Sequence, residues 1–108
     1  MTRGRILWDG KTMSLELDGH ASGSEAVCAG VSAIVGALAG YLVNHISDMA
    51  SPPVIRLDSG NARIRVQHPD LRLQTAFDMA EIGLLQIAEQ YPEYLKMKIL
   101  RKEGPTGP

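Results

Sequence analysis

Hydrophobic and polar residues alternate along the first part of the chain. Met13, Leu15 and Leu17 fall on one side of an extended strand, and the residues between them are polar. Strand patterns cover Arg3 to Trp8 and Lys11 to Gly19, and the Asp-Gly pair between them is a strong signal for a tight turn. The chain is therefore predicted to open with a β-hairpin that has one polar face.

An uncharged run follows at residues 26–46. It predicts a helix from about Ser24 to Ser47, which the Ser-Pro-Pro sequence at 51–53 stops. The run approaches the roughly 20 residues that span a bilayer, but it is rich in small residues and no basic residue flanks it. We expect a centrally buried helix and no membrane partner. Small residues at helical spacing would let another backbone approach closely, in the core or at a subunit contact: Gly30, Ala33, Ala37 and Gly40.

The second half of the chain repeats the two patterns. Strands are predicted at Val54 to Asp58 and Ala62 to Gln67, each with a polar face. After the His-Pro-Asp sequence at 68–70, apolar residues recur every three or four positions and predict a helix. These residues are Leu73, Ala76, Phe77, Ala80, Leu84, Ile87, Ala88 and Tyr91. Pro92 ends that helix, and apolar residues alternating with lysines over 95–99 predict a last strand.

The predicted order of elements is strand, strand, helix, strand, strand, helix, strand. Because hairpins join neighbours and the strands have polar faces, we expect an α+β two-layer sandwich, with a mainly antiparallel sheet of about five strands and two helices on one face. A length of 108 residues with 44% hydrophobic residues suits one domain without disulfides or structural metal. We place that domain at residues 1–103, followed by a disordered Gly/Pro tail at 104–108.

Charge and cysteine content narrow the location and the partners. A net charge of -1 provides no general attraction for nucleic acid or anionic membranes. A cluster of basic residues is expected on the sheet, but the aromatic residues of an RNA-binding platform are missing from it, so we predict a solvated face and no nucleic-acid partner. The cluster comprises Arg56, Arg63, Arg65, Lys96 and Lys98. The first apolar run ends at Trp8, too short for an export signal, and a single cysteine suits the reducing cytoplasm.

His20 and Cys28 have the residue types and the placement of a catalytic pair. His20 ends the second strand, and Cys28 falls in the first or second turn of the helix. Residues 21–24 can span up to roughly 13 Å, comparable to the roughly 10 Å between packed layers. Amides and the dipole at a helix start favour a thiolate and can receive a developing oxyanion, and a nearby imidazole would serve as the base.

The segment around this pair resembles the ribosomal-processing cysteine protease family. The motif residues stand here as Gly19, His20, Ala21, Glu25, Val27, Cys28, Ala29 and Ser32. The resemblance implies that Cys28 is the nucleophile and His20 its base. It also implies a homodimer, no metal or organic cofactor, and a protein substrate: the N-terminal extension of a large-subunit ribosomal protein, cut at an apolar, aromatic-containing site.

Two features depart from the family pattern. The loop between the histidine and the cysteine is several residues shorter than is usual, and Glu25 stands where an aspartate is customary. Because the loop is expected to wall the substrate groove, the chemistry transfers better than the specificity does. A phage structural precursor is therefore an alternative substrate.

The supporting residues have structural explanations beside the functional ones. The Ser-Gly-Ser-Glu sequence from Ser22 matches a capping box, so Glu25 either caps the helix or contacts the histidine or substrate. Ser32 lies four residues after Cys28 on the same helix face and is expected to support packing. His45 and His68 are expected to be structural, at a helix end and in a turn.

Three other hypotheses compete with a cysteine endopeptidase. A lone cysteine in an apolar helix is often an inert core residue. A fold of this kind also suits a non-catalytic interaction module associated with the ribosome. A zinc site is the weakest hypothesis, because His20 and Cys28 supply only two ligands and no second cluster lies nearby in the sequence.

Overall fold

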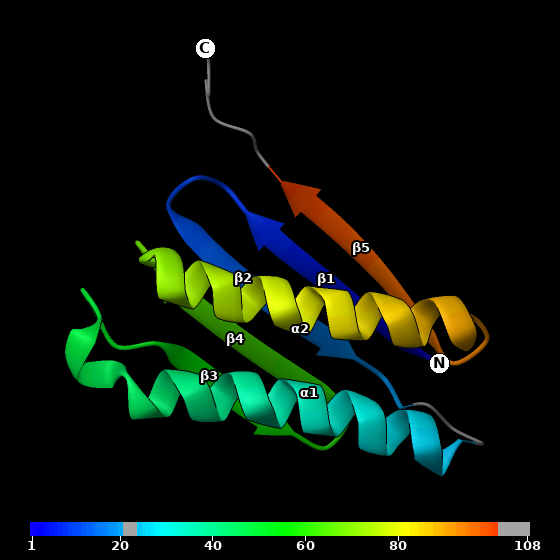
Figure 1. Ribbon diagram of the computed structural model, residues 1–108. Coiled ribbons are helices and arrows are strands. Elements are labelled where there is room, and N and C mark those ends of the chain that lie inside the picture. The colour runs from blue at the N-terminus through cyan, green and yellow to red at the C-terminus, as the bar shows by residue number, and fades with distance from the viewer. Residues whose placement is uncertain (21–23, 102–108) are drawn as a thin grey trace.

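A computed structural model gives the fold over residues 1–20 and 24–101 (Figure 1). The elements are β1 (Thr2–Trp8), β2 (Thr12–Asp18), α1 (Glu25–Asn44), the short 3-10 helix η1 (Ile46–Asp48), β3 (Val54–Asp58), β4 (Asn61–Gln67), α2 (Leu71–Gln90) and β5 (Leu95–Arg101). This order confirms the predicted one. The predicted tail, together with Ala21 and Ser22, lies outside the described residues.

The strands form one mixed sheet in the order β3-β4-β2-β1-β5. The β1–β2, β2–β4 and β3–β4 pairs are antiparallel, whereas β5 runs parallel to β1. Figure 1 shows α1 and α2 side by side over one face of this sheet. The predicted two-layer α+β sandwich with a mainly antiparallel sheet is therefore confirmed.

The core lies between the sheet and the two helices. Met13, Leu15 and Leu17 are buried on the helix-facing side of β2, as their alternation predicts. Phe77 and Leu84 of α2 are fully buried against them. Apolar residues spaced three or four apart in α2 thus pack against apolar residues spaced two apart in the strands, and together they form one hydrophobic layer.

Helix α1 departs from the expected central burial, because only one of its sides is buried. The buried side chains are Val27, Val31, Val35, Leu38, Ala39 and Leu42. Opposite them, small residues face outward: Ala29, Ser32, Ala33, Gly36, Ala37 and Gly40. By length and composition alone the helix could cross a membrane, a test that core helices also pass. Its polarity is nearly uniform, so side-chain size rather than charge distinguishes its two sides.

The two helices approach each other closely at glycines. A Cβ atom on Gly30 would lie 3.2 Å from Ile87 Cδ1, and one on Gly83 would lie 2.8 Å from Ile34 Cδ1. Among the four small residues singled out in the sequence, Gly30 is therefore used for packing inside the chain. Gly40 has open space around its Cα instead.

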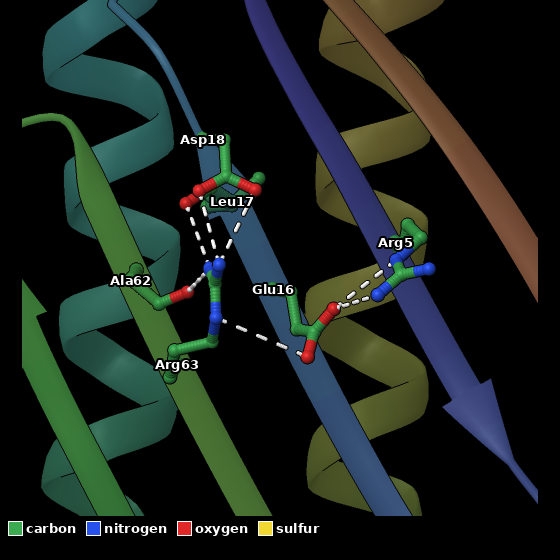
Figure 2. A network of polar contacts seen from close by, with 6 residues as sticks. All are labelled: Arg5, Glu16, Leu17, Asp18, Ala62 and Arg63. Carbon is green, nitrogen blue, oxygen red and sulfur yellow. Dashed lines mark hydrogen bonds and ion pairs between the residues drawn. The ribbon is translucent and has the colours of Figure 1, made fainter.

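The sheet face opposite the helices carries a polar network (Figure 2). Glu16 accepts hydrogen bonds from Arg5, including one of 3.1 Å from Nε. Arg63 donates from Nη2 to Asp18 Oδ1 at 3.1 Å and from Nη1 to the Leu17 carbonyl at 3.3 Å. These contacts join β1, β2 and β4, and they hold the end of β2 just before His20.

Candidate active site

Gly19 fixes the backbone where β2 leaves the sheet. Its N–H donates to the Gly60 carbonyl at 2.9 Å, and its carbonyl accepts from Thr2 Oγ1 at 3.3 Å. The φ angle of Gly19 is +93°, in the region that favours glycine. A side chain here would also run into the Met1 carbonyl oxygen. The residue before the histidine is therefore held on both sides.

The start of α1 is capped by Ser24. Its Oγ accepts from the Val27 N–H at 3.2 Å, and its backbone is extended, as an N-cap requires. Glu25 is the first helical residue, so the capping box predicted from Ser22 to Glu25 is wrong: its glutamate would need to lie three residues after the cap. The exposed Glu25 carboxylate instead lies in the first turn, where the helix dipole favours negative charge.

Cys28 lies in the first turn of α1 and is half-buried. Its N–H donates to the Ser24 carbonyl at 3.2 Å, and the Val27 N–H is used by the cap. A helix leaves its first four N–H groups without partners inside the helix. Within the described residues, the amides of Glu25 and Ala26 are therefore the ones at this helix start that neither the helix nor its cap uses.

A pocket of about 200 Å³ brings the predicted pair together. His20 and Cys28 both line it, with Gly19 beside the histidine and Ser32 one turn beyond the cysteine. Its apolar wall consists of Leu17, Val31, Val35, Leu57 and Ala62. Glu25 and Ala29, although in the motif, do not line it. The pocket thus combines a thiol, an imidazole and a hydrophobic surface.

The β3–β4 turn also borders this pocket, which the sequence pattern did not indicate. Asp58, Gly60 and Asn61 line it, and so does Thr2 from the first strand. The sequence marks 59–61 only as a turn, because the contact depends on the pairing of β2 with β4. The register that sets Asp18 opposite Asn61 is what brings this turn to the end of β2.

The other histidines lie away from the pocket. His45 caps the far end of α1, where its ring stacks on Tyr41 at 4.1 Å and its Nδ1 lies 2.8 Å from the Tyr41 carbonyl oxygen. His68 has a φ of +50° and lies in the turn before α2. Over residues 1–20 and 24–101, no three His, Cys, Asp or Glu side chains gather where they could hold a metal ion.

The pocket geometry agrees with a match to known sequences. The family model of the cysteine protease Prp matches residues 1–96. The chain belongs to this family. The Prp match includes His20, Cys28 and every other residue that lines the pocket. A search of curated proteins found no match.

Solved structures extend the match to three dimensions. The essential ribosomal processing protease Prp from S. aureus, in complex with a covalently linked product peptide, has 29% sequence identity and a TM-score of 0.72. The alignment covers 92% of this chain and 99% of that one. SMU.848 from Streptococcus mutans has 25% identity and a TM-score of 0.64, with 94% and 96% of the chains covered. The Prp fold is therefore shared over nearly the whole length.

Proposed function

We propose that this Prp family member is a cysteine endopeptidase in which Cys28 attacks the peptide and His20 is the base. The observation that carries the proposal is that both side chains line one pocket, although they come from different layers of the fold. The pocket opens at the start of a helix, where amides and the helix dipole favour negative charge. An inert core cysteine is not expected to share a pocket with a histidine.

The reaction follows from these positions. His20 accepts the proton of the Cys28 thiol, and the thiolate adds to the carbonyl carbon of the scissile bond. Amides at the start of α1 are the donors we assign to the resulting oxyanion. The imidazolium then gives its proton to the leaving amine, which breaks the C–N bond and leaves a thioester on Cys28. Water, deprotonated by His20, hydrolyses the thioester and restores both residues.

We propose a peptide substrate with apolar or aromatic side chains at the cleavage site. The apolar wall of the pocket, with Leu57 half-exposed at its edge, is suited to such a side chain. The S. aureus relative, an essential ribosomal processing protease, was crystallised with a covalently linked product peptide. By this likeness, the N-terminal extension of a large-subunit ribosomal protein is the first substrate to test, and a phage precursor protein is the second.

We also propose that the protein acts as a homodimer. The exposed sides of the two helices border a largely apolar groove of about 580 Å³, in which Ile34, Ala37 and Met79 take part. Met79 is 70% exposed and Leu71, at the end of the same groove, is 77% exposed. Large apolar side chains at such exposure suit contact with a second copy.

A peptide library tests the proposed activity. Cleavage products identified by mass spectrometry should cluster at apolar or aromatic sites, vanish in Cys28→Ala and fall steeply in His20→Ala. Glu25→Gln should have only a modest effect, because Glu25 does not line the pocket. Products that persist in Cys28→Ala would assign the cleavage to another source. Absence of cleavage by the wild type would favour a non-catalytic interaction module.

A further inference from the structure

We infer that Gly60 is a positioning residue for His20, and this inference rests on the proposed function of His20 as the base. A Cβ atom built on Gly60 would lie 2.5 Å from His20 Nε2 and 3.1 Å from both Cδ2 and Cε1. All three of these atoms belong to the ring, so the imidazole lies against the bare Cα of Gly60. The imidazole therefore packs against the β3–β4 turn at a position where any side chain larger than that of glycine would collide with the ring.

The backbone of the same turn also binds the chain next to the histidine. The Gly60 carbonyl accepts the Gly19 N–H at 2.9 Å, which ties the residue before His20 to the turn. Asp18 pairs with Asn61 in the β2–β4 register, so this bond continues the ladder of the two strands. Gly60 thus makes two contacts in this segment: its carbonyl binds Gly19, and its Cα lies against the His20 ring.

Gly60 has a conformational reason to be glycine as well. Its φ is +74°, and the turn joins strands that pair at Asp58 and Asn61 with only two residues between them. A positive φ at this turn position favours glycine whatever lies nearby. The structural role and the positioning role must therefore be separated by a second glycine with the same conformation and no histidine beside it.

Gly10 provides that comparison. It lies in the β1–β2 turn with a φ of +91°, and a Cβ atom there would have nothing within 4 Å. Gly10→Ala introduces backbone strain alone, whereas Gly60→Ala introduces similar strain and also occupies the space of the imidazole. Since a histidine ring rotates readily about its side-chain bonds, we expect it to swing aside while the hairpin stays paired. Gly60→Ala should then reduce catalytic activity more than it reduces the stability of the fold.

The experiment compares Gly60→Ala with Gly10→Ala in the full chain. We expect both variants to show similar thermal midpoints, below that of the wild type. Gly60→Ala should lower kcat/KM on apolar peptides about 100-fold, the order expected when a catalytic group is misplaced by about 1 Å, while Gly10→Ala should change it less than about twofold. When kcat/KM is plotted against pH, Gly60→Ala should also lack the part of the pH dependence that is lost in His20→Ala.

A second readout does not depend on catalysis. Ring signals of His20, assigned by their loss in His20→Ala, should move in the NMR spectrum of Gly60→Ala and stay in place in Gly10→Ala. If the wild type cleaves peptides in a His20-dependent manner and Gly60→Ala behaves like Gly10→Ala, the inference is wrong and the proposed function stands. If the wild type cleaves nothing, the proposed function fails. In that case the ring signals alone test whether Gly60 positions His20. Unchanged ring signals in Gly60→Ala would overturn the inference.

Discussion

Cys28 lies in α1 and His20 follows β2, and the fold brings both to one pocket. Cys28 is half-buried in the first turn of α1, at the positive end of the helix dipole, and His20 reaches the same pocket from the end of β2. His45 is the same residue type at the opposite end of α1, where it stacks on Tyr41. The two histidines therefore allow a matched comparison, because one shares a pocket with Cys28 and the other does not.

We predict that His20→Ala slows alkylation of Cys28 by iodoacetamide at neutral pH by about tenfold, because the variant lacks the proposed base for the thiol. His45→Ala should leave the rate within about twofold of the wild type, since its ring contacts Tyr41 instead. Mass spectrometry of quenched time points measures both rates. Equal rates in the wild type and His20→Ala would favour an inert cysteine.

At this scale the sequence singled out the two residues that share the pocket, but not the residues of the β3–β4 turn that also line it. The motif around Cys28 and the strand pattern just before His20 are local, so both residues could be identified directly from the sequence. The neighbouring Gly60 is 40 residues further along, and its contact with His20 follows from strand register, which a local pattern does not encode. The capping register was wrong for a similar reason. Two serines precede Glu25, and the pattern alone does not say that the helix begins after the second one, Ser24.

The helices act as elements whose first turns are held by side-chain caps. Ser24 caps α1 through the Val27 N–H, and Asp70 caps α2 through the Leu73 N–H at 3.0 Å. Both helices run back over the sheet from these capped ends (Figure 1). The cap of α1 also sets the amides that we assign to the oxyanion, so its effect extends beyond stability.

We predict that Ser24→Ala lowers the free energy of unfolding by about 1 kcal/mol, the usual effect of losing a serine N-cap. The cap variant should also lower kcat more than it raises KM, because the first turn of α1 carries the nucleophile. Ser47→Ala is the control, since Ser47 is exposed in η1 and caps no α-helix. Urea unfolding and peptide kinetics measure the two effects. A Ser24→Ala variant as stable as Ser47→Ala would show that the cap contributes nothing.

The cap of α2 should make stability depend on pH. The Leu73 amide, assisted by the Arg72 guanidinium, holds the pKa of Asp70 below its ordinary value of 3.8. A carboxyl whose pKa is lower in the folded state stabilises the fold above its unfolded pKa, and that contribution disappears as the pH falls through the folded pKa. Asp70→Ala should therefore be less stable than the wild type at neutral pH, and the gap should narrow below the ordinary pKa.

Urea midpoints measured from neutral pH to about pH 3 test this prediction. Glu93→Ala is the control, since Glu93 is exposed in the turn after α2 and caps no helix. Its gap to the wild type should stay small at every pH. If the stability difference between Asp70→Ala and the wild type stayed constant down to acid pH, the role assigned to the Asp70 carboxylate charge would be contradicted.

For the whole molecule, the sequence predicted the layers but not the sheet order. Alternation fixes which face of each strand is buried, and the two Gly-containing turns fix the hairpins. Nothing in β5 indicates that it lies parallel to β1 at the edge, because α2 first carries the chain from β4 past β2 and β1. The same crossover places α2 beside α1 and creates the exposed groove between them. Self-association is therefore a property to test on the assembled fold.

We predict that the protein forms a dimer at micromolar concentration and that Ala37→Glu shifts it to monomer. Ala37 is exposed in the groove between the helices, and in a two-fold dimer each copy presents the same patch, so one substitution places charge on both sides of the contact. Lys96→Glu, on the opposite sheet face, is the control for added negative charge and should stay dimeric. Sedimentation velocity measures all three proteins. A monomeric wild type would remove the dimer, and an Ala37→Glu variant that remains dimeric would move the interface to another surface, such as a sheet edge.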